Sequence, residues 1–71
     1  MALADLPYGK LAPHEVEIAR LLLQGKGNKE IAAILNKKSG SVDKQVGHIC
    51  DKMLTRSKFV AAQRAQELGQ L

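Results

Sequence analysis

Between residues 43 and 51 the chain carries the side chains best suited to chemistry, namely two carboxylates, an amine, an imidazole and a thiol: Asp43, Asp51, Lys44, His48 and Cys50. A zinc site is not expected, because His48 and Cys50 are two positions apart on a helix and point to different sides, and only His14 could join them. Two histidines and so small a core offer no Ser/His/Asp set. We therefore expect no enzyme, no metal and no cofactor, and hydrogen bonding to a partner is the chemistry that remains.

If that partner is a nucleic acid, four positions of this stretch are candidates for contact with its base edges: Asp43, Lys44, Gly47 and His48. Lys44 could reach a guanine edge or a phosphate, and Asp43 could accept a hydrogen bond from cytosine N4. The alternative for Asp43 is that it only complements the helix dipole and repels phosphate. Gly47 has no side chain with which to read a base, so it either allows close approach or costs helix stability, roughly 1 kcal/mol relative to alanine.

Cations and hydroxyls around these positions suit contacts with phosphates, which set affinity but carry no sequence information. An ordinary solvated surface is the alternative for each of them. The candidates are Lys29, Lys37, Lys38, Ser39, Ser41, Lys52, Arg56 and Lys58.

The distribution of charge favours an anionic partner. The formal net charge is +4, and eight of the eleven Lys and Arg residues lie between residues 26 and 58, with only three acids. All the excess positive charge thus falls on one part of the chain, although a solvated face is the alternative here too. Aromatic residues make up only 3% of the chain, which argues against a module that stacks single-stranded bases on exposed rings.

The length of the chain and its number of cysteines further limit the kind of protein it can be. A chain of 71 residues forms one small domain, and its single cysteine excludes an internal disulfide. The first residues lack the pattern of a signal peptide, and no stretch approaches the ~18 apolar residues of a membrane span. We expect a cytoplasmic protein that does not enter a membrane.

Apolar spacing predicts four short helices and no strand. The first runs over about 13–24, with Pro13 in its first turn and Gly25 as its stop. The second is capped by Gly27 or Asn28 and is ended by Asn36 in the left-handed conformation. The third runs over about 39–53, capped by Ser39, with an inner face of Val42, Val46, Ile49 and Met53.

Ser57 is expected to cap the last helix, which turns Ala61, Ala62, Ala65 and Leu68 inward. Residues 1–10 show no periodicity and are interpreted as a flexible tail or the remnant of a linker.

Three motifs carry a family resemblance. Leu11-Ala12-Pro13-His14-Glu15-Val16-Glu17 follows Leu-Thr-x-x-Glu-x-Glu, with Ala for Thr. Asn28-Lys29-Glu30-Ile31-Ala32-Ala33-Ile34-Leu35 matches Asn-Lys-Glu-Ile-Ala-x-x-Leu, and Ile49-Cys50-Asp51-Lys52-Met53 matches Ile-x-x-Lys-Leu/Met. In this order the chain resembles the DNA-binding domain of LuxR/FixJ/NarL-type (GerE-like) bacterial transcription regulators over about residues 11–65. The resemblance implies an all-α, four-helix helix-turn-helix domain over residues 11–71.

The same resemblance implies a sequence-specific DNA-binding transcription regulator. The helix over about 39–53 would enter the major groove, and the helix before it would lie across the groove against the backbone. The resemblance also implies a dimer formed through the last helix. Its outward stripe is small and mostly polar, so a weak homodimer is expected, with Val60, Gln63, Arg64 and Glu67 as the candidate contacts.

The chain departs from the family within the helix over about 39–53, and these departures motivate an alternative function. The family's Thr-Val-Lys-x-His corresponds to Ser41-Val42-Asp43-Lys44-Gln45, so an acid replaces a lysine that meets DNA. The alternative is a helix-turn-helix that serves as a protein-interaction module with weak or no DNA binding. It would contact RNA polymerase or block a related regulator by forming a mixed dimer.

Overall fold

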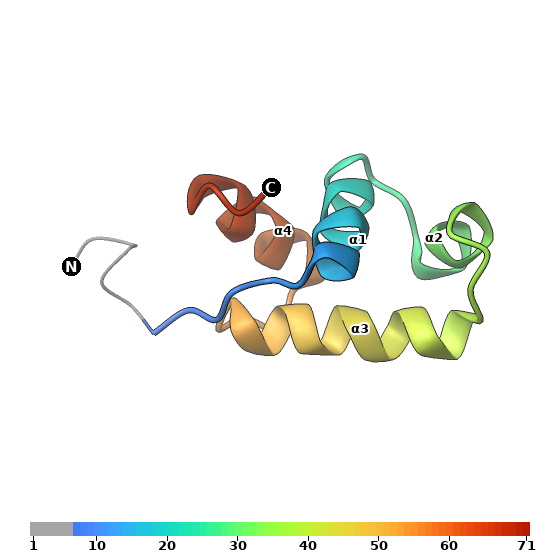
Figure 1. The fold of residues 1–71 in the computed structure, drawn as a ribbon, viewed down its shortest axis with the longest axis horizontal. Coiled ribbons are helices and arrows are strands. Elements are labelled where there is room, and N and C mark those ends of the chain that lie inside the picture. The colour runs from blue at the N-terminus through green and yellow to red at the C-terminus, as the bar shows by residue number, and fades with distance from the viewer. Residues whose placement is uncertain (1–6) are drawn as a thin grey trace.

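Four helices make up the domain in the computed structural model, which describes residues 7–71. They are α1 (Pro13–Leu23), α2 (Asn28–Ile34), α3 (Ser39–Lys52) and α4 (Lys58–Glu67), and no strand occurs among the described residues. Figure 1 shows α3 as the longest element, lying along one side of the molecule. The prediction of an all-α, four-helix helix-turn-helix domain is confirmed.

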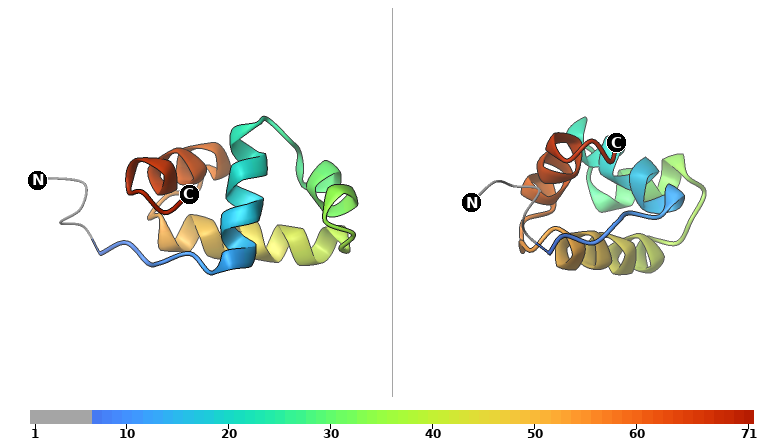
Figure 2. Two further views of the ribbon diagram at one scale, coloured as in Figure 1. Left: turned by 45° about the horizontal axis from the view of Figure 1, so that its top comes forward. Right: turned by 60° about the vertical axis from the view of Figure 1, so that its left-hand side comes forward.

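The other three helices all pack against the same side of α3 (Figures 1 and 2). The predicted inner row of α3 is correct, because Val42, Val46, Ile49 and Met53 are all buried. Since α1, α2 and α4 cover this row alone, the opposite side of α3 faces solvent in each of the three views.

The core is aliphatic, as the low aromatic content requires. Its largest fully buried side chains are Ile18, Ile31, Ile49, Met53 and Val42. Small residues of α4 complete it, because Ala61, Ala62 and Ala65 are fully buried and α4 packs against both α1 and α3. Each fully buried Val or Ile contributes roughly 1.5–3 kcal/mol, so a short aliphatic row is enough to fix α3 on the other helices.

Four residues that follow helices have positive φ, and Gly69 (φ 74°) is the one that follows α4. Gly25 (φ 82°) and Asn36 (φ 53°) end α1 and α2 in the left-handed conformation, as predicted for a glycine and an asparagine. Leu54 (φ 57°) does the same after α3, and its side chain is 48% exposed. A leucine in this conformation costs roughly 1–2 kcal/mol, so the turn into α4 carries local backbone strain.

The predicted caps of the last two helices differ in outcome. Ser57 caps α4 as predicted, since its Oγ accepts a hydrogen bond from the amide of Val60 at 3.3 Å. The prediction that Ser39 caps α3 is wrong, because Lys38 is the N-cap and Ser39 is already the first helical residue. The extended backbone of Lys38 lets its carbonyl accept from the Val42 amide, and this exposed helix start needs no side-chain cap because water can reach its first amides.

The segment before α1 is tied to the far end of the chain. The amide of Gly9 donates to the carbonyl of Lys52 at 3.0 Å, and the Gln70 side chain bonds both the Gly9 carbonyl and the Leu11 amide. Residues 1–6 of the predicted tail lie outside the described residues. No helix between residues 7 and 71 is long and apolar enough to cross a membrane.

Candidate nucleic-acid interface

The solvent-facing side of α3 carries the residues predicted to contact bases. Asp43, Lys44, Gly47 and His48 are all exposed, because the neighbouring Val42, Val46 and Ile49 take the buried positions of the same turns. A helix of this width fits the major groove of DNA, and nothing else in the described chain covers this side. The geometry therefore leaves Lys44, Gly47 and His48 free to meet a flat or grooved partner.

Charge along this side of α3 is uneven. Lys37 and Lys38 stand exposed before the helix, and Arg56 and Lys58 stand exposed after it. Ser39 and Ser41 in the first turn are exposed as well, and so is Lys29 on α2. The exposed residues of α3 between these cations instead include two acids, Asp43 in the second turn and Asp51 next to the last residue, as well as Lys44. Cations thus flank the helix at both ends, as phosphate contacts require, whereas the acids lie between them.

Lys52 differs from the other phosphate candidates, because its charge is already paired. Its Nζ lies 2.5 Å from Oε1 of Glu15, whose side chain is only 3% exposed. The same carboxylate oxygen accepts a hydrogen bond from the Ala12 amide at 2.8 Å. Burial raises the pKa of Glu15, but the hydrogen bonds from Lys52 and the Ala12 amide outweigh it and leave that pKa below its usual value.

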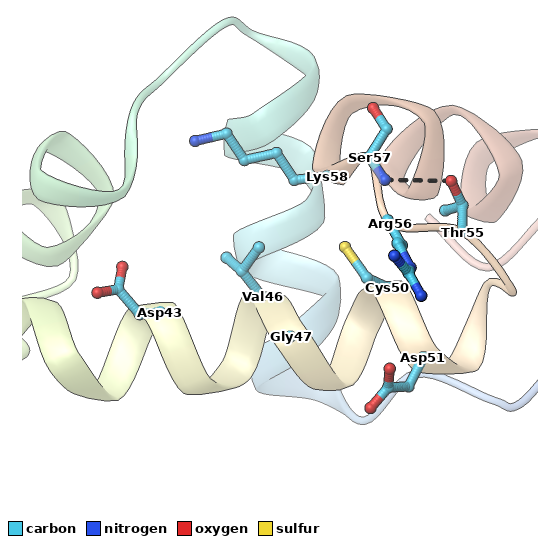
Figure 3. A pocket seen from close by; sticks show the side chains of 9 residues that line it. All are labelled: Asp43, Val46, Gly47, Cys50, Asp51, Thr55, Arg56, Ser57 and Lys58. Carbon is cyan, nitrogen blue, oxygen red and sulfur yellow. Dashed lines mark hydrogen bonds between the residues drawn. The ribbon is translucent and has the colours of Figure 1, made fainter.

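Asp43 also has a partner, on α2. Asn28 Nδ2 donates to Asp43 Oδ1 at 2.7 Å, and Lys58 Nζ donates to Asn28 Oδ1 at 3.3 Å. Figure 3 shows Asp43 rising from α3 and Lys58 reaching from the start of α4 toward α2, on the same side of α3. The sequence does not indicate this bridge, because Asn28 lies 15 positions before Asp43 and 30 before Lys58, and no local pattern connects residues so far apart.

An open groove separates α3 from the turn into α4 (Figure 3). Val46 and Cys50 form its apolar part, and Asp43, Asp51, Arg56 and Lys58 contribute its charged rim. Burial, with a smaller contribution from Asp51, raises the pKa of the Cys50 thiol, so Cys50 stays protonated at neutral pH and is a poor nucleophile or metal ligand. Residues 7–71 contain no group of three His, Cys, Asp or Glu side chains arranged to hold a metal.

On the other flank of α3, Gln45 is turned toward α1. His14 Nε2 and Gln45 Oε1 lie 3.0 Å apart, and Gln45 is half-buried. Gln45 stands where the sequence motif has histidine, and here it contacts another helix.

The four candidate dimer residues on α4 have different surroundings. Gln63 and Glu67 are exposed and Val60 is half-buried. Arg64 is engaged within the chain, because its Nη1 donates to the carbonyls of Met53 and Leu54 at 2.8 and 2.9 Å. These carbonyls end α3 and would otherwise lack partners, so Arg64 holds the turn in which Leu54 has positive φ.

Comparison with known proteins agrees with this architecture. The model of a family described as bacterial regulatory proteins, luxR family, matches residues 9–65, which include all four helices except the last two residues of α4. The chain is also similar to the transcriptional regulatory protein DesR of Bacillus subtilis (strain 168), with 36% identity over 59 residues. That alignment covers 83% of this chain and 30% of DesR, so the chain spans less than a third of the length of this relative.

Proposed function

Because the chain belongs to the luxR family of bacterial regulatory proteins, a family of DNA-binding transcription regulators, we propose that it binds specific DNA sites by inserting α3 into the major groove. Lys44 and His48 would contact base edges, with Gly47 allowing close approach. The observation that carries this proposal is the uncovered side of α3, which presents these residues with cations at both ends of the helix. A major groove about 12 Å wide admits one helix and places phosphates along both of its flanks.

The phosphate contacts would come from residues that the fold leaves exposed. Lys37, Lys38, Ser39 and Ser41 stand at the start of α3, and Arg56 and Lys58 stand beyond its end. Lys29 in the first turn of α2 would reach the backbone on the side where α2 crosses the groove. Lys52 is the weakest of these candidates, because an incoming phosphate would compete with Glu15 for it.

Pairing of two copies through α4 would match two half-sites on DNA. The exposed Gln63 and Glu67 and the half-buried Val60 form a small, mostly polar surface. Such a surface gives weak association in solution that DNA can reinforce by holding two copies side by side.

A second function is favoured by one observation, the two exposed acids on α3. Asp43 and Asp51 disfavour phosphates and suit a basic protein surface. Under this alternative α3 binds a protein, either RNA polymerase or a related regulator, and DNA binding is weak or absent.

A salt titration of binding to duplex DNA of random sequence separates the two functions. Each phosphate contact contributes about −0.9 to the slope of log K against log salt, so a slope of about −3 to −5 per domain is expected. No detectable binding at roughly 50 mM salt and tens of micromolar protein would favour the protein-interaction module.

A further inference from the structure

The bridge from Asp43 through Asn28 to Lys58 joins three helices at one point. Asp43 lies in the second turn of α3, while Asn28 and Lys58 are the first residues of α2 and α4. The bridge thus connects the starts of α2 and α4 to the helix that carries the candidate base contacts, and Figure 3 shows two of its members, Asp43 and Lys58.

The opposite charges of Asp43 and Lys58 fix the orientation of the Asn28 side-chain amide between them. The Asn28 amide has one donor end and one acceptor end, and here the donor faces the Asp43 carboxylate and the acceptor faces the Lys58 ammonium. Turning the amide over would place its NH₂ against an ammonium and its oxygen against a carboxylate, so both contacts would become repulsive. A cation at position 43 would remove this order and set a like charge beside Lys58.

The position of Asp43 on its helix agrees with a role directed toward α2 and α4. It follows the buried Val42 and precedes the buried Val46 by three residues, so it lies at the edge of the buried face of α3. Lys44, one position later, is turned away from that edge by about 100°, the rotation per residue of an α-helix. Lys44 therefore projects toward solvent, and Asp43 projects toward the groove it lines with Lys58.

We infer that Asp43 is a positioning residue of the DNA interface: through Asn28 and Lys58 it fixes the starts of α2 and α4 against α3, and it sets DNA selectivity without contacting a base. This inference rests on the proposed function. Lys29 and Lys58 hold the phosphates, and Lys44 reads the base. Because phosphate contacts set the register of a helix in the groove, the bridge decides whether Lys44 reaches its base edge.

The first experiment is a double-mutant cycle on unfolding by urea, with Asn28→Ala, Asp43→Ala and the double variant. If the two side chains bond, their effects on the unfolding equilibrium are not additive, and we expect a coupling of about two- to fivefold, the range for exposed polar pairs. Additive effects would overturn the inference. This measurement uses no DNA, so it is decisive for the bridge even if the proposed function fails.

The second experiment compares dissociation constants for two duplexes, one selected from a randomised library by the unaltered protein and one of random sequence. Asn28→Ala and Asp43→Ala should each lower the ratio of the two constants about three- to tenfold, and the double variant should lower it no further. Asp43→Asn keeps an acceptor for Asn28 and should keep most of the ratio.

Asp51→Ala is the matched control, because it removes the same charge from an exposed position of the same helix, and the Asp51 side chain makes no hydrogen bond within residues 7–71. It should tighten binding to both duplexes and leave their ratio unchanged. If only Asp43→Ala lowers the ratio, Asp43 reads a base and the inference is wrong. If Asp43→Ala behaves like Asp51→Ala, Asp43 only repels phosphate and the inference is wrong as well. If the unaltered protein binds neither duplex, the proposed function and the role of Asp43 in selectivity both fail, and the unfolding cycle still reports whether the bridge exists.

Discussion

The carboxylate of Glu15 on α1 and the ammonium of Lys52 on α3 form an ion pair with an N–O distance of 2.5 Å, in which the acid is almost wholly buried. The Glu15 carboxylate also accepts a hydrogen bond from the amide of Ala12 and so caps α1. The Glu15 side chain therefore stabilises the start of α1, anchors α1 to the last turn of α3, and neutralises Lys52 beside the candidate DNA surface.

This pair makes stability depend on pH. The pKa of Glu15 lies below its unfolded value of about 4.3, so its contribution is complete above that pH and is lost as pH falls through the lowered folded value. Glu15→Gln should lower the free energy of unfolding by about 1–2 kcal/mol at pH 7, since Lys52 is one-third exposed and can regain water. Urea unfolding from pH 7 to pH 3 should show this difference shrinking.

Glu17→Gln is the matched control, because Glu17 is exposed on the same helix. It should change stability by less than about 0.5 kcal/mol at either pH. A Glu15→Gln deficit that stays constant down to pH 3 would contradict the assignment of the acid to the ion pair.

Lys44 and Lys38 should affect DNA binding differently. Lys44→Ala should weaken a selected site more than random DNA, by about 1–3 kcal/mol, because base contacts specify. Lys38→Ala should weaken both duplexes about equally and reduce the salt slope by about 1, because phosphate contacts only position the protein. Equal losses on both duplexes for Lys44→Ala would show that Lys44 binds a phosphate.

Asp43→Lys tests the possible roles of Asp43 by reversing its charge rather than removing it. If Asp43 only repels phosphate, the added cation tightens binding to every duplex and relaxes selectivity. If Asp43 holds Asn28 and Lys58 in place, as we infer, or reads a cytosine, binding to the selected duplex weakens instead. The Asn28→Ala variant then separates these last two cases.

Arg64 should contribute to the stability of the fold more than to the pairing of two copies through α4. Arg64→Ala removes two hydrogen bonds to the carbonyls of Met53 and Leu54 and should lower the free energy of unfolding by about 1–2 kcal/mol. Gln63→Ala, one position earlier and exposed, should have an effect below about 0.5 kcal/mol. Equal stability of the two variants in thermal or urea unfolding would show that Arg64 does not support the turn after α3.

Val60 tests whether α4 pairs two copies. If two α4 helices meet near a two-fold axis, Val60→Glu places two acids close together and should abolish cooperative binding to a DNA with two half-sites. Binding to one half-site should be unchanged. Unaltered binding to the paired site, together with unaltered sedimentation at high protein concentration, would show that α4 is not the pairing surface.

The helices and the buried row of α3 could be predicted because their signals are local. Four apolar residues at helical spacing define the face that must be buried, and Gly25 and Asn36 favour the left-handed conformation that ends a helix. The cap of α4 is local as well, because the Ser57 hydroxyl accepts from an amide only three residues later, however α4 packs. Ser39 was assigned wrongly because the backbone of Lys38 alone decides where α3 begins, and an exposed start accepts either residue.

The polar contacts between helices were decided by the tertiary structure. Glu15 meets Lys52 across 37 positions, and Asn28 meets Asp43 across 15, because both pairs depend on how α1 and α2 sit on α3. Sequence alone determined which residues of α3 are exposed, since burying one face of a helix exposes the other. It could not determine which of the exposed charges remain free, because a charged side chain on a surface carries no periodic signal of its partner. Packing decided that Lys52 is neutralised by Glu15 and that Asp43 is held by Asn28.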